Sequence, residues 1–91
     1  MAVTVRIPTQ LRELSGGASE ISAEPGTVQS VLDALQSAHP GFAERLFDES
    51  GELRRFVNVF VDEEDIRFLD GVNTPVEDRA TVSIVPAVAG G

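Results

Sequence analysis

The sequence contains no cysteine at all, and it has no apolar run long enough to cross a membrane. Without cysteine the chain can form no disulfide, no thiolate metal site and no thiol nucleophile. A membrane-spanning helix needs about 20 consecutive apolar residues. The residues after Met1 enter a strand-like alternation rather than a signal peptide. We therefore expect a cytoplasmic protein.

Lysine is also absent, so all seven basic residues are arginine, and fifteen acidic residues bring the formal net charge to −8. This charge argues against nucleic acid and membrane surfaces as partners, because both bind clustered cations. A basic protein surface suits the chain better. Two explanations of the missing lysines stay open: codon bias in a GC-rich genome, and protection of an activated acyl end from side-chain amines.

The chain offers little that could form a catalytic centre or a metal site. Its single histidine, His39, precedes Pro40 at a predicted helix end, where we expect a capping or solvent-facing role. The acidic run Asp62–Asp65 lacks the spaced ligands and the glycine of a calcium-binding loop. A chain of 91 residues also leaves little room for an enzyme cleft. We expect no bound metal, no bound cofactor and no enzymatic activity.

Hydrophobic periodicity predicts several short strands and one main helix. Alternating apolar and polar residues place the strands at residues 3–7, 18–23, 53–61, 66–69 and 81–85. Thr27 is a suitable N-cap for the helix, and His39–Gly41 end it. The apolar stripe of this helix comprises Val28, Val31, Leu32, Leu35 and Ala38. A further helical turn is expected at residues 42–47.

This order of elements predicts an α+β fold of the β-grasp (ubiquitin-like) type. A mixed sheet of four to five strands would carry the main helix across one face, with the first and last strands adjacent at its centre. Residues 1–85 form the expected domain, and residues 86–91 form a flexible C-terminal tail that ends in Gly-Gly.

The tail is the most informative part of the sequence. Its six residues carry no charge and reach roughly 20 Å when extended. Gly90 and Gly91 lack a Cβ atom and so could enter a narrow channel of a partner, and the Gly91 carboxylate is an unhindered acyl group. We therefore predict Gly91, with Gly90, as the reacting end. The tail residues expected to bind the partner are Pro86, Ala87, Val88 and Ala89.

A second candidate site lies on the face of the sheet that the helix leaves open. If Val57, Val59 and Val61 face the helix, the alternation turns their neighbours to the opposite side. The residues predicted to form a partly apolar, partner-binding patch there are Arg6, Phe56, Asn58, Phe60 and Val85, beside Thr4 and Ser83. The alternative is that loops cover the two phenylalanines.

Two stretches of the sequence resemble a known family. One is Val-Ser-Ile-Val-Pro-Ala-Val-Ala-Gly-Gly at residues 82–91, and the other is Arg-Phe-Val-Asn-Val-Phe-Val-Asp-Glu-Glu-Asp-Ile-Arg-Phe at residues 55–68. Both are similar to the ThiS/MoaD sulfur-carrier family, and residues 55–68 most resemble its actinobacterial CysO-type branch. The resemblance covers nearly the whole chain.

The resemblance implies a protein co-substrate rather than an enzyme. An adenylating enzyme related to ubiquitin activators would use ATP to convert the Gly91 carboxylate to an acyl-adenylate, and a sulfur donor would replace AMP. The resulting thiocarboxylate would attack an electrophile on a sulfur-accepting synthase. In the CysO-type pathway that electrophile is a pyridoxal-phosphate-bound aminoacrylate, and a zinc metalloprotease releases the cysteine formed. The carrier itself would bind neither ATP, pyridoxal phosphate nor zinc.

Several alternatives stay open. The chain could be the small subunit of molybdopterin synthase, or it could carry sulfur to a thiamin thiazole, a thiosugar or another natural product. It could also be a ubiquitin-like modifier that is joined to a target lysine, or an interaction domain with an inert tail. We expect a monomer when no partner is present.

Overall fold

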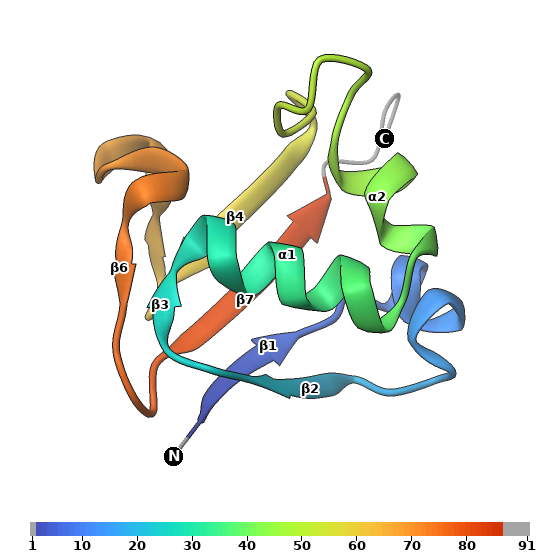
Figure 1. Cartoon of the computed structure of the whole chain (residues 1–91), viewed down its shortest axis with the longest axis horizontal. Helices are drawn as coiled ribbons and strands as arrows, with labels where there is room; N and C mark the ends of the chain where they lie inside the picture. Colours follow the sequence, from blue (N-terminus) through green and yellow to red (C-terminus); the bar gives the residue numbers. More distant parts are fainter. Residues whose placement is uncertain (1, 87–91) are drawn as a thin grey trace.

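The computed structural model describes residues 2–86 as a sheet with helices packed on one face (Figure 1). The strands are β1 (Val3–Arg6), β2 (Glu20–Ala23), β3 (Gly26–Thr27), β4 (Val57–Val61), β5 (Glu64–Asp65), β6 (Pro75–Val76) and β7 (Thr81–Pro86). The helices are α1 (Val28–Ala38) and α2 (Gly41–Leu46), with short 3-10 helices η1 (Thr9–Ser15), η2 (Ile66–Phe68) and η3 (Gly71–Asn73). Among these residues no helix has the length and hydrophobicity to cross a membrane.

The main sheet has five strands in the order β2-β1-β7-β4-β5, and α1 lies across it (Figure 1). The first and last strands are adjacent and parallel, with Val5 beside Val82, whereas β2 and β4 pair antiparallel with their neighbours. This confirms the predicted β-grasp fold. It also confirms that the first and last strands meet at the centre of the sheet.

The core lies between the sheet and the two helices. The sheet contributes alternate residues of its strands, namely Val3, Val5, Val57, Val59, Val82 and Ile84, all buried. The buried residues of the helices are Val28, Val31, Leu32 and Leu35 from α1, with Phe42 and Leu46 from α2. The predicted inward faces of the strands and the helix are therefore confirmed. Ala38 is exposed, because it is the last residue of α1 and lies at the margin of the apolar stripe.

Helix α1 begins with a reciprocal cap. The Thr27 hydroxyl oxygen accepts a hydrogen bond from the Ser30 amide at 3.2 Å, and the Thr27 amide donates to the Ser30 hydroxyl oxygen at 2.9 Å. Two amide groups that the first turn leaves without helical partners are thus satisfied. At the other end, the amide of His39 donates to the Leu35 carbonyl oxygen at 2.8 Å. Both predicted helix boundaries are confirmed.

The predicted strand at residues 53–61 is too long at its start, because β4 begins only at Val57. Pro86, the last residue of β7, pairs with Val57. No residue of β7 therefore lies opposite the residues that precede Val57. Those residues bond locally instead. The Arg54 amide donates to the Leu46 carbonyl oxygen at 2.9 Å, and the Arg54 carbonyl oxygen accepts from the Val57 amide at 3.0 Å.

The predicted strand at residues 66–69 is wrong, because Ile66–Phe68 form the 3-10 helix η2. The Asp65 carboxylate accepts a hydrogen bond from the Arg67 amide at 2.9 Å, and this local bond favours a turn over an extended strand. The strand that does follow β4 is the two-residue β5. Nothing in the sequence indicated the small β3–β6 sheet, since each of its strands has two residues and one contains proline.

A tight hairpin joins β4 to β5 through Asp62 and Glu63, which have φ angles of 49° and 75°. Positive φ at both positions is typical of a type I′ turn, where asparagine and glycine are more usual. Asp62 is held there by β7: its carboxylate accepts from the Thr81 amide at 3.0 Å, and its own amide donates to the Thr81 carbonyl oxygen at 2.9 Å. The acidic run is therefore part of the structure of the hairpin.

The cap of α1 gives a test of the fold. Thr27→Ala removes the acceptor for the Ser30 amide, and we expect the free energy of unfolding to fall by about 1 kcal/mol. Ser37→Ala, at an exposed position inside the same helix, should change it by less than about 0.5 kcal/mol. Urea denaturation followed by circular dichroism compares the two. Equal effects of the two substitutions would contradict a stabilising cap.

Candidate functional site

The tail predicted at residues 86–91 shares its first residue, Pro86, with the end of β7. β1 pairs with β7 only as far as Arg6 beside Ser83, whereas β4 follows β7 to its last residue, with Val57 beside Pro86. Because β1 and β7 are parallel, this end of the sheet is opposite to the end where β1 begins (Figure 1). The predicted tail residues Ala87, Val88, Ala89, Gly90 and Gly91 lie outside the described residues.

The sheet brings four of the five predicted patch residues together on its open face. Arg6 of β1 lies beside Ser83 of β7, and Ser83 lies beside Phe60 of β4. One row closer to the end of β7, Asn58 lies beside Val85. Residues that pair across neighbouring strands point to the same face. This is the face away from α1, because the alternate residues of the same strands are buried under the helix.

Strand alternation predicted that Phe56 belongs to the same face, and this argument is wrong. The residue precedes β4 in a turn that the bond from the Val57 amide to the Arg54 carbonyl oxygen closes. Alternation therefore does not assign it to a face. Its side chain is 46% exposed, so it is available to a partner beside the end of β7.

The open face combines apolar and cationic groups close to the end of β7. Val85 is 45% exposed, and Phe60 and Asn58 are each half-buried. Arg6 is exposed and lies beside Glu20 of β2 in the register of the sheet. Exposed apolar side chains next to charged groups are typical of protein interfaces. Such a surface can bind and orient a protein.

A hollow of about 400 Å³ adjoins this face beside the last residues of β7. Arg6, Ser83 and Val85 line it together with Pro8 and Arg12, which sequence reasoning missed. Arg12 belongs to η1, and its Nε donates to the Ile7 carbonyl oxygen at 3.1 Å, which holds the side chain against the end of β1. The sequence offered no signal for this segment, because a 3-10 helix has no strong apolar period.

The other candidates from the sequence, His39 and the acidic run at residues 62–65, take part in packing and in backbone hydrogen bonds. His39 follows α1 and packs edge-on against Phe42, with ring centroids 6.1 Å apart. Within residues 2–86 no group of histidine and acidic residues is placed to hold a metal ion. The carboxylates of Asp62 and Asp65 accept the backbone hydrogen bonds described above.

Comparisons with known proteins agree with these features. The ThiS family model matches residues 5–91. The sulfur carrier protein CysO of Mycobacterium tuberculosis is 47% identical over 93 aligned positions, which cover all of both chains. A chain in the crystal structure of the Amycolatopsis orientalis BexX/CysO complex superposes with a TM-score of 0.91 at 47% identity, covering 99% of this chain and 100% of that one.

A more distant relative is small archaeal modifier protein 3 of Haloferax volcanii. It is 40% identical over 68 residues, which cover 75% of this chain and 73% of that protein. The family match extends through both the open-face residues of β1, β4 and β7 and the terminal glycines. The chain therefore belongs to the ThiS family, and it is similar over its full length to the sulfur carriers named CysO.

Proposed function

We propose that this protein is a sulfur carrier for cysteine biosynthesis and that the carboxylate of Gly91 carries the sulfur. The observation that supports this most directly is the 47% identity to CysO over the whole of both chains. The family match that continues to Gly91 supports the choice of this carboxylate. The protein is then a co-substrate of other enzymes and does not catalyse a reaction itself.

Two group transfers would charge the carrier. In the first, a carboxylate oxygen of Gly91 attacks the α-phosphate of ATP on an adenylating enzyme, and pyrophosphate leaves. In the second, sulfide from a sulfur donor attacks the acyl carbon, a C–S bond forms, the C–O bond to AMP breaks and AMP leaves. The product is a thiocarboxylate. ATP and the sulfur donor are bound by the partners in this scheme.

The thiocarboxylate would then deliver its sulfur to a second enzyme. The acceptor we propose is a synthase with pyridoxal phosphate, on which the sulfur attacks the β-carbon of a bound aminoacrylate. A proton added at the α-carbon would complete a cysteine joined to Gly91 as a thioester, transfer of the acyl group from sulfur to the cysteine amine would give an amide, and a zinc metalloprotease would hydrolyse that amide with water. The known complex of an Amycolatopsis CysO with BexX supports the idea that carriers of this kind form defined complexes with partner proteins.

The body of the protein would serve these reactions by presenting the tail. β7 is paired on both sides up to Ser83 and on one side up to Pro86, so the starting point of the tail is fixed relative to the open face. A partner that binds the face therefore receives the tail from a constant position. Terminal glycines suit a narrow catalytic channel, because they have no Cβ to exclude.

The mass of the intact protein from its native host tests the proposed chemistry. We expect a fraction in which one oxygen is replaced by sulfur, located at Gly91 by fragmentation. A cysteine adduct at the same residue would identify the acceptor as well. Because thiocarboxylates hydrolyse, the measurement is repeated with the adenylating enzyme, ATP and a sulfide source. A carboxylate that stays unmodified with every adenylating enzyme of the host would contradict the proposal.

Deletion of Gly90 and Gly91 is the matched loss-of-function variant. The deletion lies after the last residue of β7, so it should leave the circular dichroism spectrum and the unfolding midpoint unchanged. Thiocarboxylate formation should fall below detection. Formation of a thiocarboxylate by the shortened chain would show that the reacting end is not specific to Gly-Gly.

The missing lysines can be tested with two charge-conserving substitutions. Arg55→Lys adds an amine just before β4, whose first residue pairs with Pro86 at the end of β7. Arg79→Lys adds an amine near the start of β1 instead, because the Arg79 amide donates to the Ala2 carbonyl oxygen at 2.9 Å. Incubated with the adenylating enzyme and ATP without sulfide, the Arg55 variant should form an internal amide as AMP leaves. Mass spectrometry should find little of this internal amide in the Arg79 variant. Equal products in both would leave codon bias as the explanation.

The open face can be tested with a substitution at its most exposed apolar position. Val85→Asp places a charge beside the end of β7, and we expect the KM of the adenylating enzyme for the carrier to rise about tenfold, which corresponds to about 1.4 kcal/mol of lost binding. Ala34→Asp, on the exposed face of α1, is the control and should leave KM unchanged. Similar KM values for the two variants would show that the open face does not contact the adenylating enzyme.

The archaeal relative supports a second candidate function, that of a ubiquitin-like modifier. In that case Gly91 would form an amide with a lysine of a target protein, and the same adenylation step would precede it. The two functions differ in their products. A modifier gives conjugates of higher mass in native extracts that disappear when Gly90 and Gly91 are deleted, and a sulfur carrier gives the thiocarboxylate alone.

A further inference from the structure

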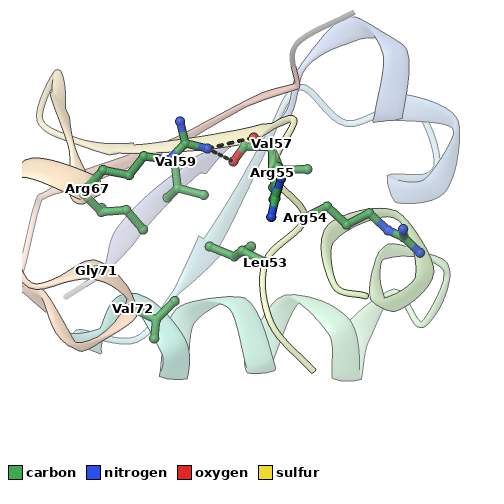
Figure 2. Close-up of a pocket in the computed structure, with 9 residues that line it drawn as sticks. Leu53, Arg54, Arg55, Val57, Val59, Arg67, Gly71 and Val72 are labelled. Atoms are coloured by element: carbon green, nitrogen blue, oxygen red, sulfur yellow. Dashed lines mark hydrogen bonds between the residues drawn. The ribbon is translucent and has the colours of Figure 1, made fainter. Parts of the chain in front are cut away.

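A cavity of about 470 Å³ opens on the outer edge of β4, on the other side of that strand from β7. Figure 2 shows Val57 and Val59 of β4 above Leu53 and Val72, with Arg67 to the left and Arg55 to the right. The remaining residues that line it are Arg54, Ile66 and Gly71. It is separate from the open face, because Val57 and Val59 point toward the helices.

The cavity exists because β5 is too short to cover β4. β5 pairs only with Phe60 and Val61, so the first residues of β4 have no strand on their outer side. The chain then turns into η2, which packs against β4, and into η3, which packs against α1. Val57 and Val59 therefore lie at the base of the cavity, where each is nearly fully buried.

Five of the nine residues that line the cavity are large and apolar. Val57, Val59 and Ile66 belong to the hydrophobic core, and the half-buried Leu53 and Val72 pack against that core at the opening. Apolar pockets of this size with a few polar groups at the edge are typical of binding sites. A leucine or isoleucine side chain from another protein would fit the volume and would lose its contact with water there.

The charges at the cavity differ from those of the chain as a whole. Three of the seven arginines line it and none of the fifteen acidic residues does, in a protein of net charge −8. Arg67 is held in place, since its guanidinium donates to the carbonyl oxygens of Arg55 at 2.8 Å and of Val57 at 3.4 Å (Figure 2). An anion at the margin would meet a cation whose position is already fixed, which favours binding.

The side chain of Arg54 bonds to a different part of the protein. Its Nε donates to the Glu44 carbonyl oxygen at 3.0 Å, and Figure 2 shows its side chain directed away from the cavity. Its charge also contributes, after hydrogen bonds from Ser50 and Glu52, to lowering the pKa of Asp48. Arg55 and Arg67 therefore remain as the cations that an occupant would meet.

We propose that this cavity is a second docking site, and that it binds a segment of a partner protein in which an apolar side chain is flanked by carboxylates. The apolar side chain enters between Leu53 and Val72, and the carboxylates bind Arg55 and Arg67. Val57, which lines the cavity, pairs with Pro86, so a partner that holds the tail lies within reach of the site. The inference rests on the proposed function only in requiring a partner protein.

A peptide titration tests the site without any activated tail. The probe is acetyl-Glu-Leu-Glu-amide, added to ¹⁵N-labelled full-length protein, and the matched control probe is acetyl-Gln-Leu-Gln-amide. We expect amide shifts at Val59, Ile66 and Val72, an affinity at least threefold weaker for the neutral peptide, and weaker binding of the acidic peptide at high salt.

Two protein variants complete the experiment. Arg55→Glu, at an exposed side chain, should reduce the affinity for the acidic peptide at least tenfold, and Arg79→Glu, at an exposed site outside the cavity, should not. The proposal is overturned if neither peptide shifts these amides. It is also overturned if the neutral peptide binds as tightly as the acidic peptide and Arg55→Glu binds the acidic peptide as tightly as the unaltered protein does. The titration does not depend on Gly91, so a failed thiocarboxylate assay would count against the proposed function alone.

Discussion

Strand β7 is hydrogen-bonded on both sides, to β1 and to β4, and the arrangement of the rest of the molecule depends on this double pairing. The last strand of the chain thereby occupies the centre of the sheet, and its alternate residues Val82 and Ile84 lie under α1. A terminal strand at the edge of a sheet can fray, whereas a central one is fixed from both sides. From Val85 to Pro86 the strand is still paired with β4, so the start of the tail is held on one side. In the function we propose, this constraint gives the tail a defined starting position.

The two sides of β4 have different surroundings, and the difference follows from strand length. Toward β7 all five residues of β4 are paired, whereas toward β5 only Phe60 and Val61 are. Arg67 bonds to backbone carbonyl oxygens where strand pairing is missing, and it thereby covers part of an edge that could otherwise attract another chain. The same gap leaves the apolar cavity beside it. One short strand thus explains both the guarded edge and the proposed second docking site.

The chemistry we propose needs no reactive group other than a carboxylate at the end of the chain. The described residues contain no metal-binding cluster, and the carboxylates of Asp62 and Asp65 are used to hold turns. Arginine supplies every cation of the sequence, and its guanidinium stays protonated, so it is a poor nucleophile toward an activated acyl group. In the proposed chemistry, the described part of the protein therefore offers few groups that could attack the activated end. This division agrees with membership of the ThiS family.

Local periodicity and the side chain of Thr27 were enough to predict the fold class, the helix with its cap, and the inward faces of the strands. Through the β4 and β7 alternation, the sequence also predicted four residues of the open face, whereas the site predicted at Gly90 and Gly91 lies outside the described residues. Tertiary contacts set where strands end, since β4 begins only where β7 offers a partner, at Pro86 beside Val57. They also form the cavity, which residues from four segments line. Ile66–Phe68 form a helical turn instead of the predicted strand. These features depend on contacts between residues far apart in the chain, and local periodicity contains no information about them.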